Sequence, residues 1–366
     1  MNNNILISTK SNDAMSQAVA AMLTTLGFSP HLYYAATLPM QDKNSIYIDE
    51  SVNFHSENMP NILPETGFRS IWMRRPDSPY LYGVNTDEDD RKYINEVLYS
   101  YSSSLMSLLV HKYTRTAFWV NTMNGRFMAS SKALQLKLAK EEGLSIPPTV
   151  ITNSPVSLRR FHEKHGALIC KPLVMGGWGT FENGRAISFA AKVDDIDDLP
   201  DDSILIQPAI YQPYIDKLFE IRATFFGGVC FSVAIDTQSN SASKIDSRGV
   251  VWDSSNCTPF DLPNDIQQMC QSVMRSLGIV YATADFIVNK EGEVIFLEMN
   301  EAGQSLFMEQ AFPGFPILHS FSHFLAYGNL ENWHHRENLT LIDIERSDIY
   351  KELRSKARLW VSSPSL

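Results

Sequence analysis

The sequence has few cysteines, no long apolar run and no segment that resembles a secretion signal. Its four cysteines are scattered without CxxC or Cys/His ligand spacing, which argues against a zinc site and fits free thiols in a reducing cytoplasm. No apolar run approaches the roughly 20 residues that span a bilayer. The first residues, MNNNILISTKSNDA, lack a basic stretch followed by a long apolar one. We therefore expect a cytoplasmic protein with no membrane partner.

Positively charged residues are fewer than negatively charged ones. The chain has 31 Lys and Arg against 41 Asp and Glu, which gives a formal net charge of −10. Because nucleic-acid binding normally requires a basic surplus or patch, we expect no nucleic-acid partner. Hydrophobic residues make up 44% of the chain, as is typical of a globular protein, and a length of 366 residues predicts two or three packed lobes.

The N-terminal part of the chain alternates between strand-like and helical patterns. The run NILIS at 4–8 reads as a strand, and a helical pattern over 13–27 ends at a glycine. Further apolar runs lie at 31–36, 45–48 and 68–75, and residues 87–112 carry helical periodicity. This alternation predicts a small α/β lobe.

From Phe118 onward the pattern changes to several strands with fewer helices between them. An amphipathic helix is predicted at 126–142, and strands are predicted throughout 203–236. The other predicted elements are a helix near 155–164, a strand at 167–173, a Gly-rich segment at 174–185, a helix at 263–277, strands at 280–288 and 293–299, and a helical C-terminal segment. This order predicts α+β lobes built on antiparallel sheets, in place of one doubly wound sheet.

The stretch VIFLEMNEAG at 294–303 starts as a buried strand and ends with polar side chains. Since alternate residues of a strand share a face, Glu298 and Asn300 point the same way. Asp285 lies on the preceding strand, and the turn NKEG between the two strands would bring all three side chains together. Such oxygen donors are the ligands that a magnesium–nucleotide complex needs. Taken alone, the stretch also fits a strand that frays into a polar loop.

Basic side chains in or at the ends of strands point to a bound anion. Lys171 follows the apolar run ALIC, where an unpaired charge is costly, and a phosphate would satisfy it. The glycines of MGGWG at 175–179 offer backbone amides to the same anion. Arg222 lies inside a predicted strand, where it needs a carboxylate or a bound anion as partner. Lys132 lies in a helical pattern and, by itself, fits a solvated lysine.

Together these residues resemble the nucleotide site of the ATP-grasp ligases. The set runs in the order Lys132, Lys171 before a Gly-rich loop, a hinge segment, Arg222, Asp285, and Glu298 with Asn300, and it covers residues 118 to about 312. Further motifs resemble the peptide-modifying ATP-grasp enzymes that make microviridins and other graspetides: IWMRRP at 71–76, QPYIDKLFEIR at 212–222, IDTQ at 235–238, Asp246-Ser-Arg248, and Asn300-Glu-Ala-Gly-Gln304. With these motifs the match covers nearly the whole chain.

The resemblance implies an α/β (α+β) protein with the ATP-grasp fold, in which two α+β lobes enclose the nucleotide and follow a small α/β domain. The implied divisions are an N-terminal domain at 1–117, a central lobe at 118–206, a C-terminal lobe at 207–330 and a helical tail at 331–366. A homodimer is also implied, because related ligases commonly form one.

The resemblance also assigns residues to ATP and to Mg²⁺. The adenine is expected against the hinge, where Pro213 cannot donate a backbone hydrogen bond, and the phosphates are expected near two lysines. The implied ATP-binding residues are Lys132, Lys171, Gln212, Pro213, Tyr214, Ile215, Lys217 and Asn300. The implied ligands of Mg²⁺ are Asp285, Glu298 and Asn300.

The activity implied is that of an ATP-dependent ligase that converts an Asp or Glu side chain of a ribosomally made precursor peptide into an acylphosphate. A Thr, Ser or Lys side chain of the same peptide then displaces phosphate and closes an ester or amide macrocycle. Arg222 and Arg248 are implied to hold the acyl phosphate, and Asp246 to orient Arg248 or to accept the nucleophile's proton. A leader segment of the precursor is expected to dock near 176–190. The pair at 74–75 in IWMRRP either binds acidic precursor residues or joins two lobes.

Two other functions fit the same residues. An ATP-grasp ligase could join an amino acid or a small amine to a peptide intermolecularly, and the mass of the product would distinguish it, because ring closure only loses water. A non-catalytic nucleotide-binding protein would bind ATP or ADP without turnover. An NAD-binding Rossmann protein is excluded, since ILISTKSNDA lacks the glycines that let a pyrophosphate approach a helix N-terminus.

Overall fold

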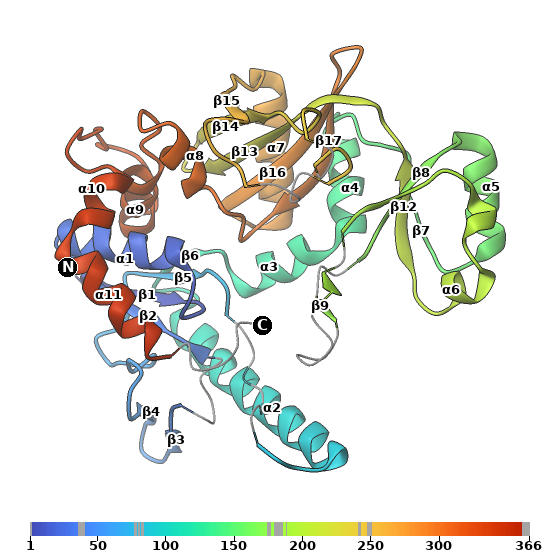
Figure 1. Ribbon diagram of the computed structural model, residues 1–366. Helices are drawn as coiled ribbons and strands as arrows, with labels where there is room; N and C mark the ends of the chain where they lie inside the picture. Colours follow the sequence, from blue (N-terminus) through green and yellow to red (C-terminus); the bar gives the residue numbers. More distant parts are fainter. Residues whose placement is uncertain are drawn as a thin grey trace.

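The computed structural model shows a mixed α/β protein whose separate sheets are joined and covered by helices (Figure 1). It describes residues 2–35, 41–76, 79, 81, 84–173, 177–178, 186–187, 189–240, 243–246 and 251–360, with the backbone alone at 177–178 and 186–187. None of the described helices is both long and apolar enough to cross a membrane. All four cysteines are free thiols.

The N-terminal lobe contains a parallel sheet. Its strands, in the order β2-β1-β5-β6, are β1 (Asn4–Ser8), β2 (Ser29–Tyr33), β5 (Ser70–Met73) and β6 (Phe118–Val120). Helix α1 (Ala14–Thr25) begins where the Asp13 side chain accepts the Ser16 N–H, and it packs against this sheet. A hairpin of β3 (Asn44–Ile48) and β4 (Val52–Ser56) and the long helix α2 (Glu88–Tyr113) complete the predicted α/β lobe.

A second, antiparallel sheet lies in the middle of the chain and is called the middle sheet below. Its strands, in the order β11-β8-β12-β7, are β7 (Val150–Thr152), β8 (Leu168–Lys171), β11 (Ala191–Val193) and β12 (Ala209–Pro213). Helix α5 (Pro155–His165) covers one face of the sheet through Leu158. The short strands β9 (Gly177–Trp178) and β10 (Ala186–Ile187) pair antiparallel in a separate two-stranded sheet.

One segment beside the middle sheet differs from the prediction. Residues 204–207 were expected to form a strand, but they begin inside helix α6 (Asp201–Leu205), which follows the 3-10 turn η3 (Ile196–Asp198). Pro200 precedes this helix, and Asp201 and Asp202 lie in its first turn, where acidic side chains are favourable. A short apolar run does not distinguish strand from helix, so these helix-start signals outweigh it.

The third sheet is five-stranded and antiparallel. Its strands, in the order β15-β14-β13-β16-β17, are β13 (Lys217–Phe226), β14 (Val229–Ile235), β15 (Cys257–Pro259), β16 (Tyr281–Asn289) and β17 (Val294–Asn300). One face packs against α3 (Met123–Ser130), α4 (Lys132–Glu141) and α7 (Asn264–Leu277). The single helix predicted at 126–142 is wrong, because Ser131 is extended and its hydroxyl accepts the Leu134 N–H to start α4.

The C-terminal helices return to the N-terminal lobe. They are α8 (Leu306–Ala311), α9 (Ile317–Tyr327), α10 (Leu341–Arg346) and α11 (Asp348–Arg358). Helices α9, α10 and α11 lie beside α1 (Figure 1), and Phe321 and Ile344 share a hydrophobic core with Ile7 and Val19. Strand β17 therefore leads directly into a part of the chain that contacts the first lobe.

Candidate functional site

Neighbouring strands of the five-stranded sheet bring Arg222, Asp285 and Glu298 into one row, called the carboxylate row below. Arg222 of β13 is opposite Asp285 of β16, and Asp285 is opposite Glu298 of β17. Asn300 lies in the next row, opposite Thr283. Directly opposed residues point to the same side of a sheet, so these side chains lie together, as the sequence predicted.

The opposite face of the same strands is hydrophobic. Ala284, Phe286 and Phe296 are fully buried there against α3, α4 and α7. In a regular strand, Phe296 and Glu298 would share a face. A register shift after Asp285 leaves Leu297 as an extra residue in β17. This bulge keeps Phe296 in the core while Glu298 turns to the polar side.

Each carboxylate of the row has a basic neighbour. The Nζ of Lys132, the first residue of α4, lies 2.5 Å from the Oε2 of Glu298, and the Nε of Arg222 lies 3.4 Å from the Oδ1 of Asp285. Burial would raise the pKa of Glu298, but Lys132 and Lys171 outweigh it, and the pKa is lowered. Burial raises the pKa of Asp285 to about 6, although Arg222 limits the rise. Glu298 is therefore the more strongly ionised carboxylate.

Arg222 is nearly buried and incompletely paired. Its Nε has no hydrogen-bond partner among the described residues, because its approach to Asp285 has the distance of an ion pair without the geometry of a hydrogen bond. The guanidinium carbon lies 4.7 Å from the ring centre of Trp252. A buried donor without a partner costs free energy, so this guanidinium is suited to an anion placed over the sheet.

Lys171 is the last residue of β8. Its side chain lies on the face of the middle sheet opposite the hydrophobic core that contains Leu168. Its Nζ donates to the Oε1 of Gln212 at 2.9 Å, and the Nε2 of Gln212 donates to the Oγ1 of Thr149 at 3.0 Å. Burial lowers the pKa of Lys171, although Glu298 acts in the opposite direction. Cys170 points the other way and packs on the hydrophobic core. Lys171 is thus a desolvated cation that a phosphate would stabilise.

The predicted hinge joins the end of β12 to the start of β13. Pro213 ends β12, and the Tyr214 N–H is already donated to a backbone carbonyl at 2.8 Å. Ile215 is half-buried in the connection. Lys217 opens β13, and its Nζ lies 2.5 Å from the Oε1 of Glu220. Pro213 has no N–H group and the N–H of Tyr214 is already engaged, so neither residue can donate a backbone hydrogen bond to an adenine.

Some predicted site residues lie at or beyond the limits of the described structure. Asp246 accepts the Ala190 N–H at 3.1 Å. Arg248 lies outside the described residues, as do most of the Gly-rich segment 174–185 and of the segment 176–190 expected to bind a leader. The roles assigned to these positions stay predictions.

Arg74 joins the N-terminal lobe to the segment that follows β17. It is fully buried, its Nε lies 3.1 Å from the Oδ2 of Asp13, and it donates to the carbonyls of Ala302 and Gly303. Arg75 donates to the Ala302 carbonyl at 3.5 Å. Of the two roles considered for Arg74, the contacts support the joining of lobes, because a fully buried guanidinium cannot contact a peptide.

Three further side chains that the sequence analysis missed hold β17 and its end. Asn121 donates to the Glu301 carbonyl, and the Nη1 of Arg126 lies 2.7 Å from the Oε2 of Glu301. Gln135 accepts the Met299 N–H and donates to the Met299 carbonyl. The position of Asn121, just after a parallel strand, is a signal that could have marked it, since functional residues gather at that edge. Arg126 and Gln135 carry no such signal.

The oxygen donors beside the carboxylate row fit magnesium. Asp285, Glu298 and Asn300 offer carboxylate and amide oxygens, the hard ligands that Mg²⁺ prefers. Within the described residues, no group of three or more His, Cys, Asp or Glu is arranged to hold a metal. Magnesium–nucleotide sites use one or two carboxylates and complete the coordination with phosphates and water. The residues present therefore fit a metal that arrives with a phosphate.

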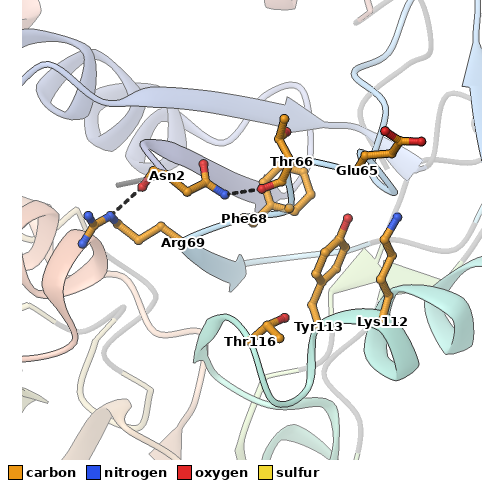
Figure 2. A pocket seen from close by; sticks show the side chains of 9 residues that line it. Asn2, Glu65, Thr66, Phe68, Arg69, Lys112, Tyr113 and Thr116 are labelled. Atoms are coloured by element: carbon orange, nitrogen blue, oxygen red, sulfur yellow. Dashed lines mark hydrogen bonds between the residues drawn. The ribbon is translucent and has the colours of Figure 1, made fainter.

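A separate pocket lies in the N-terminal lobe. It has a volume of about 570 Å³ and lies between the turn at 65–69 and the end of α2 (Figure 2). Figure 2 shows Lys112 and Tyr113 directed toward this turn, and they donate to the carbonyls of Leu63 and Pro64. These polar groups are engaged within the protein, and the five-stranded sheet does not line the pocket.

Solved structures resemble this chain over nearly its whole length. The macrocyclase MdnC from Microcystis aeruginosa MRC, bound with the precursor peptide MdnA, matches with a TM-score of 0.74 and 22% identity over 89% of this chain and 99% of that one. A Chryseobacterium gregarium RiPP-associated ATP-grasp ligase, in complex with ADP and a leader and core peptide, matches with a TM-score of 0.73 and 23% identity over 92% and 98%. The chain has the ATP-grasp fold.

A third ATP-grasp structure carries a metal as well as a nucleotide. The ligase PsnB, complexed with a minimal precursor, Mg and ADP, matches with a TM-score of 0.66 and 17% identity over 88% of this chain and 97% of that one. The ATP-grasp fold expected from the sequence is thereby confirmed. No protein-family model matches the chain, and no curated protein matches it.

Proposed function

We propose that this ATP-grasp chain is a ligase that activates carboxylates of a precursor peptide with ATP and closes ester or amide macrocycles. The observation that carries the proposal is the carboxylate row, in which Lys132 and Lys171 lower the pKa of Glu298. It combines oxygen donors for a divalent cation, a buried arginine for a phosphoryl group and lysines for a triphosphate. The precursor peptides bound by solved proteins of the same fold support this choice of substrate.

In this proposal the nucleotide lies between the middle sheet and the five-stranded sheet. Its adenine contacts the hinge at 212–215, and Lys217 lies near the ribose or the phosphates. Lys132 and Lys171 bind phosphate oxygens. Burial lowers the pKa of Lys171, which disfavours its charged form, and a neighbouring phosphate would offset this effect.

Asp285, Glu298 and Asn300 hold Mg²⁺ in the same proposal. When bound, the ion offsets negative charge on the phosphate oxygens of the nucleotide. Lys132 pairs with Glu298 in the structure described here, so it exchanges this carboxylate for a phosphate oxygen when the nucleotide binds. Lys132 and Glu298 then each have a partner of opposite charge in both states.

The proposed chemistry proceeds in two steps. The substrate carboxylate attacks the γ-phosphorus, the bond to the β–γ bridging oxygen breaks, and an acylphosphate and ADP form. A hydroxyl or amine of the peptide then attacks the acyl carbon, gives up a proton and releases phosphate. Arg222 and Arg248 hold the acyl phosphate and stabilise its developing charge. Asp246 orients Arg248 or accepts the proton.

Mass spectrometry of candidate precursor peptides tests this proposal. Peptides that contain Asp or Glu together with Thr, Ser or Lys are incubated with the protein, ATP and Mg²⁺. Each ring should remove one water and release one ADP, and Glu298→Ala should abolish both. A product that gains the mass of an amino acid or amine supports the intermolecular ligase instead. Nucleotide binding without turnover on any such peptide supports the non-catalytic alternative.

A further inference from the structure

Two buried threonines lie next to the carboxylate row on the polar face of the five-stranded sheet. Thr224 of β13 is opposite Thr283 of β16, and Thr283 is opposite Asn300 of β17. Thr224 is two residues from Arg222 in a regular part of β13, so the two side chains share a face. Both threonines are fully buried, and they are called the threonine pair below.

The threonine pair separates the polar site from the hydrophobic core. The next row on the same face contains Phe226 and Tyr281, which are buried and pack against Phe321 of α9. Valine has nearly the shape of threonine and would fill this boundary without a polar group. Because a buried hydroxyl is unfavourable unless it is hydrogen-bonded, two of them at this position require partners.

The two hydroxyls and the neighbouring arginine lack partners at the same place. The Oγ1 of Thr224, the Oγ1 of Thr283 and the Nε of Arg222 are all buried, and none has a hydrogen-bond partner among the described residues. Side chains opposed across antiparallel strands have their Cβ atoms about 5 Å apart, which is too far for a direct hydrogen bond here but leaves room for a bridging group. The three atoms therefore surround one position on the sheet.

One water molecule matches these atoms in number and in kind. A buried water typically forms about three hydrogen bonds to polar groups that are otherwise unsatisfied. The Nε–H of Arg222 can only donate, and the water oxygen accepts it. The two hydrogens of the water can then be donated to the hydroxyl oxygens of the threonine pair. A bare cation does not fit this position, because the guanidinium group repels it and offers it no lone pair.

A water at this position would hold one edge of the Arg222 guanidinium. Its face is already covered, since the guanidinium carbon lies 4.7 Å from the ring centre of Trp252. Trp252 is in turn supported by Phe307 of α8, with their ring centres 5.1 Å apart. With its face and its Nε edge held, the guanidinium has a fixed orientation, and its Nη groups are left for an anion.

We propose that the threonine pair and the Nε of Arg222 bind one buried water molecule, and that the threonine pair positions Arg222 through it. Thr224 and Thr283 are then positioning residues, because they act on an anion only through the arginine. The water site follows from the buried atoms alone. Its purpose, to hold Arg222 ready for an acyl phosphate, rests on the proposed function.

A high-resolution crystal structure of the full chain tests the water site without any substrate. One ordered water should lie within about 3.2 Å of all three atoms. Thr224→Val and Thr283→Val should each unfold at a lower urea concentration than the wild type, because the remaining buried groups lose a partner. Thr258→Val, at an exposed position of β15, should unfold as the wild type does. Hydroxyls that bond only to protein atoms, or valine variants more stable than the wild type, would overturn the proposal.

Peptide modification tests the positioning of Arg222. Each valine variant should form product at least about tenfold more slowly while its affinity for ADP with Mg²⁺ is unchanged, because a displaced guanidinium misses the acyl phosphate. Thr224→Ser and Thr283→Ser keep the hydroxyl and should restore most of the rate. The double valine variant should lose less than the two single losses multiplied, since both hydroxyls act through the same water.

The outcomes separate this inference from the proposed function. Valine variants that form product as fast as the wild type would overturn the positioning role. Serine variants as slow as the valine variants would overturn it too, because the hydroxyl would then not be the cause. A wild-type chain that holds the water but forms no product with any peptide would support the water site and contradict the proposed function.

Discussion

The Nζ of Lys132 lies 2.5 Å from the Oε2 of Glu298, so a carboxylate proposed to bind magnesium is engaged by a lysine of α4. Arg222 stands beside Asp285 in a similar way. In this state a free metal ion must compete with a cation at each carboxylate. A bound phosphate would draw Lys132 away from Glu298 and leave this carboxylate free for the metal. The binding of the metal would then be coupled to the binding of the nucleotide.

Lys132→Met should therefore strengthen the binding of a free divalent cation while it weakens the binding of ATP. With the ion pair removed, we expect Mn²⁺ without nucleotide to bind about fivefold more tightly, which corresponds to ~1 kcal/mol. Electron paramagnetic resonance titration with Mn²⁺ measures this affinity, and Lys137→Met, an exposed lysine of the same helix, is the control. Unchanged or weaker Mn²⁺ binding in Lys132→Met would show that the lysine does not compete with the metal.

Arg222 is predicted to act after the nucleotide has bound. Arg222→Met should leave the affinity for ADP with Mg²⁺ nearly unchanged and should lower product formation by at least about 100-fold, because the guanidinium is assigned to the acyl phosphate. Calorimetric titration measures the first quantity and mass spectrometry of the product the second. Arg159→Met, on the surface of α5, is a matched control. Equal losses of affinity and product would move Arg222 to the nucleotide site.

The pair of Arg126 and Glu301 should stabilise the segment that follows Asn300. Both side chains are largely buried, so Arg126→Met leaves a carboxylate without its partner. We expect the free energy of unfolding to fall by about 2–3 kcal/mol. A second variant, Arg126→Met with Glu301→Gln, should recover most of this loss. Urea denaturation measures both, and a double variant no more stable than the single one would rule out the unpaired carboxylate as the cause.

Glu309 predicts a pH dependence of stability. It is 1% exposed, and its carboxylate accepts the N–H groups of Leu318 and Leu341 at the starts of α9 and α10. Burial raises its pKa from 4.5 to about 7. Because the folded pKa lies above the unfolded one, the stability contributed by the protonated form is fully present below about pH 4.5 and is lost as the pH rises through about 7, up to about 3 kcal/mol.

Glu309→Gln resembles the protonated carboxyl and should keep that stability at higher pH. Between about pH 5 and about pH 8, the difference in unfolding free energy between the two proteins should move by about 2–3 kcal/mol in favour of the variant. Urea denaturation at both pH values measures it. If the difference stays constant, Glu309 does not change its protonation on folding in this range.

The meeting of Asp285, Glu298 and Asn300 could be predicted because it depends on short-range rules. Alternation along a strand sets the faces, and the tight turn at 289–292 sets which strands pair. The bulge at Leu297 could not be predicted, since nothing in VIFLEM marks it. The prediction placed Glu298 and Asn300 on one face correctly, but only the bulge separates Glu298 from the core face of Phe296.

No signal in the sequence identifies which distant residues contact one another, even where a position such as that of Asn121 could have been marked as functional. Arg126 and Asn121 reach Glu301 from far along the chain, and no periodicity encodes such partners. Gly303 is similar, because a Cβ there would lie 2.1 Å from the Oγ1 of Thr283. This glycine permits a close approach that becomes visible only once the strands are placed.

The central claim is that Asp285, Glu298 and Asn300 bind the metal ion that accompanies the nucleotide. The most direct measurement is Mn²⁺ binding in the presence of ADP by electron paramagnetic resonance, with thermal unfolding to show that each variant is folded. Affinity should fall by at least about 50-fold in Glu298→Ala and in Asn300→Ala, while Glu291→Ala, an exposed carboxylate of the same hairpin, should bind as the wild type does. Nucleotide-dependent Mn²⁺ binding that survives in folded Glu298→Ala and Asn300→Ala would contradict the account.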